Sequence, residues 1–394
     1  MTTTGELLVI GGGIGGLATA LAVARTGRRV RVLEQSAQFA EIGAGLQLAP
    51  NATRILDRLG VLDRVIEAGV LPQRLVLGDA LTGRELTHLP LEDFPERYGG
   101  PYVVLHRGDL LDILVDGCRA HGVTLENGKR FVALDDLPDR VVVHCEDGSH
   151  YEGTAAVGAD GLRASTRTTL SDDEPVCSGF VAYRGAIPIE EATRLAELTD
   201  VVAWIGPGLH FVQYPLRGGR LYNQVAVFRS PRYTAGYEDW GTPEELDEVF
   251  SVTCEHVRAA VPALWRDQRW AMYDREPLAT WVAGRLVLLG DAAHPMLQYL
   301  AQGACQAIED AAALADTLDR HLAPGDGDPA LVGQALHAYQ AERVPRAARI
   351  QRVARTWGDI WHVDGLAALL RNEVLTQRPP DDHRHVGWLY GPTT

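Results

Sequence analysis

Long apolar runs and an excess of basic residues are both missing from this 394-residue chain. No uninterrupted apolar stretch approaches the roughly 18 residues that a transmembrane helix needs, so we expect no stable membrane association. No basic segment precedes the first apolar strand, so we also expect no signal peptide. The formal net charge is -15, which argues against nucleic acid or an anionic membrane surface as a partner.

Cysteine is sparse, and its spacing excludes several kinds of site. No CxxC pair occurs, so we expect scattered reduced thiols and a cytoplasmic protein. The 13 histidines show no HExxH or similar ligand spacing, so the sequence predicts no metal site. Ser165 does not stand in a nucleophile-elbow sequence, which argues against hydrolase chemistry. The cysteines are Cys118, Cys145, Cys177, Cys254 and Cys305.

The chain does contain a series of glycine-and-acid elements, the first of them near its start. An apolar strand at residues 7–10 leads into GGGIGG, and a helix of small and apolar residues follows. In GxGxxG the glycines permit a tight turn, backbone approach to a pyrophosphate, and close helix–strand packing. Glu34 ends the next strand, where a carboxylate can bind a ribose diol and would repel a 2′-phosphate. The residues expected at this end of a dinucleotide are Gly11, Gly13, Gly15, Gly16, Glu34 and Gln35.

Two more acids follow later strands. Asp291 ends a buried strand at residues 285–289, where it can bind a polyol or cap the following helix. Asp160 can bind the same cofactor or cap residues 162–167. A long dinucleotide such as FAD would contact all these elements. They would bind its adenosine end, its pyrophosphate and its ribityl chain.

Two local structures can also be predicted. Residues 141–144 and 154–158 are expected to pair as a hairpin around an Asp147-Gly148 turn. Asn51 is expected to cap the helix that follows it.

The middle of the chain, from about residue 178 to 272, is rich in alternating strands, aromatics and hairpin turns. Its clearest hairpin is HFVQYPLRGGRLYNQVAVF. Because side chains alternate along a strand, His210, Val212 and Tyr214 share one face. If that face lines a pocket, it presents an imidazole and a phenol to an aromatic acid.

His210 is a suitable general base, because a phenol must lose proton character before an electrophilic oxygen can attack its ring. Two other interpretations stay open: His210 bonded only to backbone or solvent, and Tyr214 as a core aromatic. His294 is expected to be structural.

GGGIGG, GADGLRASTR and GRLVLLGDAAHP resemble the three fingerprints of class A flavoprotein aromatic hydroxylases, the single-component FAD monooxygenases. The resemblance covers nearly the whole chain. EIGAGLQLAPNATRIL, RYGGPYVVLHRGDL, LHFVQYPLRGG and GDAAHPMLQYLAQGA most resemble the 3-hydroxybenzoate 6-hydroxylase branch. The chain departs from the family at Gln302 and Cys305, in a loop beside the flavin where smaller residues are common.

The resemblance implies an α/β fold, with a Rossmann-like FAD-binding domain, an inserted sheet-rich substrate domain and C-terminal helices. The expected FAD-binding domain is discontinuous, over residues 1–75, 101–175 and 273–345. Residues 76–100 and 176–272 form the expected substrate domain, and residues 346–394 the C-terminal helical region.

The resemblance also implies roles for individual residues. Glu34 matches the ribose-binding acid, Arg107 an arginine that contacts FAD, and Asp160 an acid associated with both FAD and NAD(P)H. Asp291 matches the ribityl contact, and Gly303 and Ala304 lie beside the flavin ring. His210 and Tyr214 would be catalytic, and Gln47, Tyr102 and Gln298 would contact the substrate.

The implied reaction uses bound FAD, NADH and O₂ to hydroxylate a phenolic acid, with NADPH as a possible replacement for NADH. The expected conversion is 3-hydroxybenzoate to gentisate, by hydroxylation para to the phenol; salicylate, a hydroxynicotinate or a natural-product phenol are alternatives. A homodimer is expected, and Trp357 and Trp361, four residues apart, are candidates for its contact.

Two more distant alternatives remain. A flavin halogenase should carry WxWxIP and an active-site lysine, but the chain has only WIGP from Trp204, and its one lysine is Lys129. A flavin-binding protein without turnover would not need His210 and Tyr214 on one face.

Overall fold

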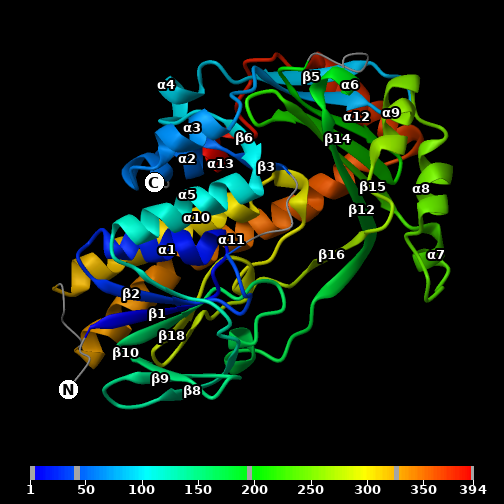
Figure 1. Cartoon of the computed structure of the whole chain (residues 1–394). Coiled ribbons are helices and arrows are strands. Elements are labelled where there is room, and N and C mark those ends of the chain that lie inside the picture. The colour runs from blue at the N-terminus through cyan, green and yellow to red at the C-terminus, as the bar shows by residue number, and fades with distance from the viewer. Residues whose placement is uncertain (1–4, 40–44, 193–197, 324–327, 392–394) are drawn as a thin grey trace.

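The structure is a computed structural model that describes residues 5–39, 45–192, 198–323 and 328–391. Its first layer is a six-stranded sheet in which neighbouring strands are parallel, except for the antiparallel pair β17 and β18 (Figure 1). The order is β17 (Val282–Ala283), β18 (Leu286–Leu288), β11 (Ala155–Gly158), β1 (Glu6–Ile10), β2 (Arg29–Leu33) and β7 (Thr124–Glu126). The chain therefore begins in the predicted strand–helix–strand unit.

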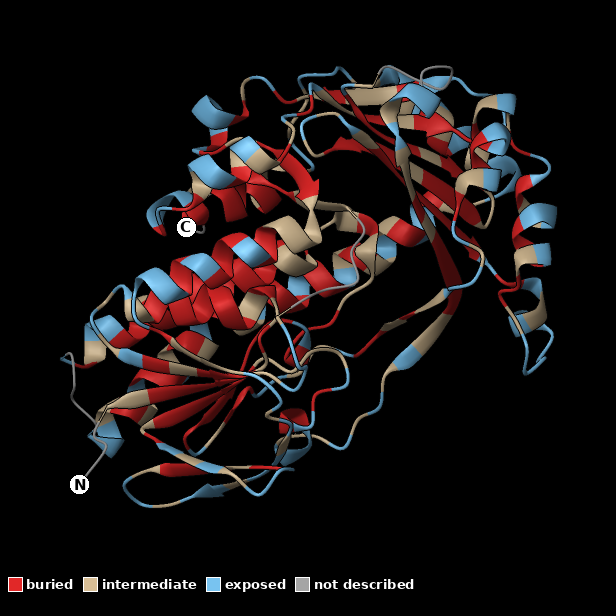
Figure 2. Ribbon diagram, viewed as in Figure 1, coloured by how far each residue is buried: buried red, intermediate tan, exposed pale blue. Residues whose placement is uncertain are grey.

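This sheet is covered on both faces, as Figure 2 shows by burial. Leu7 and Val9 of β1 face one core with three helices, whereas Leu8 and Ile10 face a second core with a small antiparallel sheet. The helices are α1 (Ile14–Ala24), α5 (Arg107–Ala120) and α10 (Gly303–His321), and the small sheet is β8 (Phe131–Asp136), β9 (Val141–Cys145) and β10 (His150–Gly153).

The predicted hairpin at 141–144 has a different partner. β9 pairs with β10, and residues 155–158 form β11, a parallel strand between β1 and β18. All four residues of β11 are buried, as expected of a central parallel strand covered on both faces. The pairing with residues 154–158 is therefore wrong.

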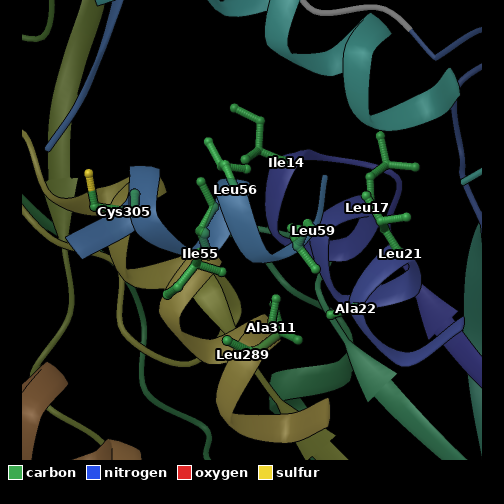
Figure 3. Close-up of a cluster of buried hydrophobic side chains, with 14 of the residues drawn as sticks. Ile14, Leu17, Leu21, Ala22, Ile55, Leu56, Leu59, Leu289, Cys305 and Ala311 are labelled. Carbon is green, nitrogen blue, oxygen red and sulfur yellow. The ribbon is translucent and has the colours of Figure 1, made fainter. Parts of the chain in front are cut away.

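Small residues bring α1 and α10 close together, and Figure 3 shows the apolar cluster at this contact. A Cβ on Gly15 would stand 3.1 Å from the Cβ of Ala307 and 3.0 Å from a methyl of Leu289. The absence of a side chain at Gly15 thus lets α10 lie against the start of α1, beside the glycine loop.

The second layer is a seven-stranded mixed sheet, with β14 near its centre (Figure 1). It joins two strands from early in the chain to five from residues 176–274. The order is β16 (Trp270–Asp274), β12 (Val176–Pro188), β15 (Leu221–Arg229), β14 (Leu209–Leu216), β13 (Val201–Gly206), β4 (Arg74–Asp79) and β5 (Glu85–Pro90). The predicted hairpin around Gly218-Gly219 is confirmed as β14 and β15.

One face of this sheet packs on short helices, and the other turns toward the first layer. Phe211 and Phe228 pack against Phe250 on the helix side. These helices are α7 (Pro231–Thr234), α8 (Pro243–Phe250) and α9 (Glu255–Ala260).

The remaining elements complete the fold. β3 (Gly45–Leu48) pairs with β6 (Val103–His106) between them. The helices are α2 (Pro50–Arg58), α3 (Leu62–Ala68), α4 (Phe94–Tyr98), α6 (Ile189–Ala192), α11 (Pro329–Trp361), α12 (Gly365–Gln377) and α13 (Gly387–Tyr390), with 3-10 turns η1 (Thr166–Thr169), η2 (Val261–Ala263), η3 (Gly290–Ala292) and η4 (Gln298–Leu300). Helix α11 is continuous through residues 345 and 346, so a boundary there would divide one helix. In the described part of the chain, none of the helices combines the length and the hydropathy of a membrane-spanning segment.

A buried network of charged groups ties α10 to α11. Arg343 donates to Asp310 (2.7 Å) and to Glu309 (2.6 Å), and Arg346 donates to Glu309 (2.7 Å). Asp310 also bonds the His294 ring (2.6 Å) and is fully buried. Burial alone would raise the pKa of Asp310, but His294 and Arg343 hold it at about 2.

Asn51 belongs to the same network, so the prediction that it caps a helix is wrong. Helix α2 begins at Pro50, with Ala49 as its N-cap. The buried amide of Asn51 donates instead to Gln302 (2.9 Å) and Glu309 (2.7 Å). Proline is well suited to a first helical position, so α2 can begin without a side-chain cap.

Replacement of Arg343 by methionine is expected to lower the free energy of unfolding by about 3–5 kcal/mol, because it leaves two buried carboxylates without their shared partner. The measurement is urea unfolding of the FAD-loaded protein. Arg352→Met, at an exposed position of the same helix, is the control. Equal stabilities of the two variants would contradict a structural role for the network.

Candidate active site

A cavity of about 1700 Å³ opens between the two layers, and both contribute to its wall. This volume exceeds the roughly 300–1,000 Å³ of a pocket for one small ligand, so it has room for a dinucleotide and a substrate. Apart from Gly16, every residue expected to bind cofactor or substrate lines it. The structure thus brings together residues that lie nearly 300 positions apart in the chain.

The glycine loop has the shape that a pyrophosphate requires. Gly11 has a φ of +111°, and a Cβ there would stand 2.3 Å from the carbonyl oxygen of Ala159. Gly16 lies outside the cavity wall because it packs on the loop itself, where a Cβ would stand 2.0 Å from the Gly11 oxygen. Gly13 is the N-cap of α1, and a Cβ on it would meet no protein atom within 4 Å. The open side of Gly13 and the helix N-terminus fit a phosphate group.

Glu34 follows β2 directly and helps to shape this loop. Its two carboxylate oxygens accept hydrogen bonds from the backbone N–H of Gly12 (2.7 Å) and of Ser36 (2.7 Å). Each oxygen keeps a second acceptor position. Glu34 can therefore bind a ribose diol while it holds the loop, and its neighbour Gln35 is exposed along the same wall.

Asp160 lies between β11 and η1. It accepts hydrogen bonds from the backbone N–H of Thr166 (3.0 Å) and from its hydroxyl. Burial raises the pKa of Asp160, and these bonds oppose the rise. Asp160 is not the N-cap of residues 162–167, because η1 begins at Thr166 with Ser165 as its N-cap. Its carboxylate binds the first residue of η1, and the residue also lines the cavity.

Arg167 is a structural residue that sequence reasoning missed. It is 1% exposed, and it donates to the carbonyl oxygens of Ala292 (3.0 Å) and Ala293 (2.8 Å). It thereby joins the middle fingerprint to the last one.

Asp291 is exposed in the cavity wall, near the start of α10. A Cβ on Gly303 would lie 3.9 Å from its carboxylate. The N–H of Gly290 donates to Asp310 (2.9 Å), so the buried network fixes the turn that presents Asp291. Arg107 begins α5 on the same wall.

The other half of the cavity is built on β14. His210, Val212 and Tyr214 all line it, so the predicted shared face is present in the structure. Leu209 and Phe211 pack on the opposite side of the sheet. His210 is 1% exposed, and both burial and the neighbouring His362 lower its pKa well below 6.5. His210 is therefore neutral at pH 7 and can accept a proton.

Two tyrosine hydroxyl groups lie near the side-chain amide of Gln47. The hydroxyl of Tyr102 donates to Gln47 Oε1 (2.6 Å), and Tyr214 lies within hydrogen-bonding reach of the same side chain. Burial raises the pKa of both phenols, so both stay protonated at neutral pH. Gln298 begins η4 on the facing wall.

His362, at the end of α11, is a second residue that the sequence did not indicate. Its Nε2 lies 2.9 Å from Nδ1 of His210, and the two rings stack 5.1 Å apart. The pair comes from segments 152 residues apart. No short sequence motif contains both histidines, so their contact could not be predicted from spacing.

The tryptophan pair on α11 lies at this site. Trp361 is 7% exposed, and its ring centroid lies 5.3 Å from that of His210. Trp357 also lines the cavity. The suggestion that the pair marks a dimer contact is thus wrong for Trp361, which is buried within its own chain.

Gly13→Ala is expected to weaken FAD binding by about tenfold or more, equivalent to ~1.4 kcal/mol, without loss of fold stability. The added methyl would occupy the space that a pyrophosphate needs but would meet no protein atom. The measurement is titration of the apoprotein with FAD by flavin fluorescence.

Gly333→Ala, also in open space but on α11, is the control for this prediction. Equal FAD affinity of the two variants would contradict the placement of the pyrophosphate at Gly13.

Comparisons with known proteins show which family this chain resembles. A family model described as "FAD binding domain" matches residues 4–354. The chain is 40% identical to 3-hydroxybenzoate 6-hydroxylase 1 of Aquipseudomonas alcaligenes, over 99% of this chain and 98% of that protein. It is 38% identical to 3-hydroxybenzoate 6-hydroxylase of Polaromonas naphthalenivorans, over 98% and 95%.

Among solved structures, Klebsiella pneumoniae HpxO complexed with FAD and uric acid is similar, with a TM-score of 0.85 and 27% identity over 100% of this chain and 98% of that one. Together with the cavity, these findings confirm the predicted family and fold. The chain belongs to the FAD-dependent, single-component flavoprotein aromatic monooxygenases.

Proposed function

We propose that this enzyme hydroxylates 3-hydroxybenzoate to gentisate, with NADH as the reductant. The observation that carries the proposal is a neutral imidazole, His210, in a cavity that also holds an arginine without a carboxylate partner among the described residues. One group can accept a phenolic proton and the other can bind a carboxylate. The names of the relatives with 40% and 38% identity support the same substrate.

The arginine without a described carboxylate partner is Arg184. It projects from β12 into the cavity and lies over the Trp270 ring, 5.2 Å from its centroid. Its Nε is buried without a hydrogen-bond partner, and no described carboxylate forms an ion pair with it. Burial lowers its pKa. A desolvated cation of this kind needs an anion, and an aromatic carboxylate is suitable.

The register of the sheet gives the separation between Arg184 and His210. Arg184 pairs with Val225, and Val225 pairs with Val212. Arg184 therefore lies two strands from Val212, which is about 10 Å, and His210 lies two residues along β14, about 7 Å. Their side chains reach into one cavity from separate positions, which suits a ring with a hydroxyl and a carboxylate on different carbons.

The protein's own part in the reaction follows from these groups. FAD, when bound and reduced by NADH, would activate O₂, so that one oxygen atom is transferred to the ring and the other leaves as water. His210 accepts the phenolic proton, which raises electron density ortho and para to the oxygen. Tyr214, Tyr102 and Gln298 orient the ring, and the buried walls exclude water. Attack from the para carbon gives gentisate.

The direct test is NADH oxidation by the FAD-loaded protein with 3-hydroxybenzoate, salicylate and 4-hydroxybenzoate, with chromatography of the products. We expect gentisate, formed only from 3-hydroxybenzoate. Peroxide without hydroxylated product from any acid would overturn the proposed substrate. The same assay with NADPH tests the reductant. Gel filtration with light scattering tests the proposed homodimer.

His210→Ala is expected to keep bound FAD and to lose product formation by about 10²- to 10⁴-fold, the usual contribution of a general base. Product formation per NADH is the measurement. Undiminished hydroxylation would remove the proposed base.

Arg184→Met is expected to weaken the apparent affinity for 3-hydroxybenzoate, with a KM higher by about 10- to 100-fold, the value of a hydrogen bond to a charged group. The corresponding amide, 3-hydroxybenzamide, has no carboxylate, and its KM should not change. Arg232→Met is the control, since Arg232 also lies over an aromatic ring, Tyr237, but outside the cavity wall. An equal loss with acid and amide would contradict carboxylate binding.

A further inference from the structure

The bond between His210 and His362 connects the cavity to the outside of the protein. His210 is 1% exposed and lines the cavity, whereas His362 is partly exposed. Nδ1 of the first ring and Nε2 of the second are 2.9 Å apart. This leaves Nε2 of His210 for a ligand and Nδ1 of His362 for water.

Both rings are held by backbone and by aromatic packing. The carbonyl oxygen of His362 accepts the N–H of Gly208 (3.1 Å), one residue before β14 begins. Its ring stacks on Phe180 at 4.6 Å, and Tyr299 packs edge-on at 5.3 Å. The distance between the two imidazoles is therefore fixed by the joint between α11 and β14.

We propose that His362 relays to solvent the proton that His210 takes from the phenolic substrate; this rests on the proposed function of His210. The phenol O–H bond breaks and an N–H bond forms at Nε2 of His210. The proton on Nδ1 of His210 passes to Nε2 of His362. A proton then leaves Nδ1 of His362 for water, so both rings end neutral and no electron is transferred.

The surroundings favour transfer over storage of the proton. The buried His210 ring cannot remain charged, because no described carboxylate bonds to it. Burial, followed by the charges of Arg229 and Arg371, lowers the pKa of His362 to about 3. Asp359, one turn earlier on α11, is exposed. The second ring therefore also releases a proton at neutral pH.

The test measures proton release directly. FAD-loaded protein in weak buffer with a pH indicator is mixed with 3-hydroxybenzoate in a stopped-flow instrument. His362→Phe keeps the stacked ring and removes the hydrogen bond, whereas His362→Gln keeps a hydrogen bond at the position of Nε2 but cannot pass on a proton. His256→Gln, on the opposite side of the same sheet and bonded to Gln213, is the matched control.

We expect the wild type and the control to release a proton rapidly, and both His362 variants to be slower by about 10- to 100-fold. The equilibrium affinity for the acid should not change, and free imidazole should restore part of the rate. A wild-type rate in His362→Gln, or no proton release by the wild type, would overturn the relay. Slow release in the variants, without gentisate from the wild type, would support the relay and reject the proposed product.

Discussion

The buried ion network around Arg343 is the constraint on which the cofactor half of the site depends. Two carboxylates on neighbouring positions of α10, Glu309 and Asp310, would repel each other in the core without their shared arginine. Through Asp310 the network reaches the turn at Gly290, and through Glu309 it reaches Asn51. The network thus fixes the turn at Gly290, which lines the cavity, and the first turn of α2.

Helix α11 carries this constraint to the substrate half. It has 33 residues, so it spans about 50 Å, and Arg343 and His362 lie about 28 Å apart along it. Arg343 ties the helix to α10, while Trp361 and His362 pack against His210 on β14. One helix, with Pro345 inside it, therefore connects the buried network to the proposed base.

Much of the cofactor half could be predicted from the sequence, because its signals are local. Gly11, Gly13 and Glu34 belong to one strand–helix–strand unit, and the chemistry of a phosphate and a ribose fixes their spacing. The shared face of His210 and Tyr214 could also be predicted, since alternation along a strand needs no knowledge of the fold. The strand at residues 7–10, the helix after the glycine loop and the hairpin around Gly218-Gly219 are correct, whereas the pairing predicted around Asp147-Gly148 is not.

The errors and omissions have one physical cause, which is contact between distant segments. Asparagine is a common helix cap, but the amide of Asn51 donates a hydrogen bond to Glu309 on α10 instead. The sequence suggests a hairpin partner for β11 because the nearest strand precedes it in the chain. Its actual place beside β1 depends on the arrangement of the whole sheet. Gln302 and Cys305 were expected in a loop, but Gln302 is the N-cap of α10 and Cys305 lies in its first turn. They contact Asn51 and the backbone of Ala49, which lie far from them in the sequence. Arg184 and His362 belong to no sequence motif. Their importance follows only from the fold, which places Arg184 in the cavity wall and His362 beside His210.

A crystal structure of the FAD-loaded protein with 3-hydroxybenzoate would test the account most directly. The account predicts the phenolic oxygen within about 2.6–3.2 Å of Nε2 of His210, the carboxylate on the guanidinium of Arg184, and the hydrogen bond from His210 to His362 intact. A reversed acid, with its carboxylate toward His210 and no ligand atom near Arg184, would contradict it.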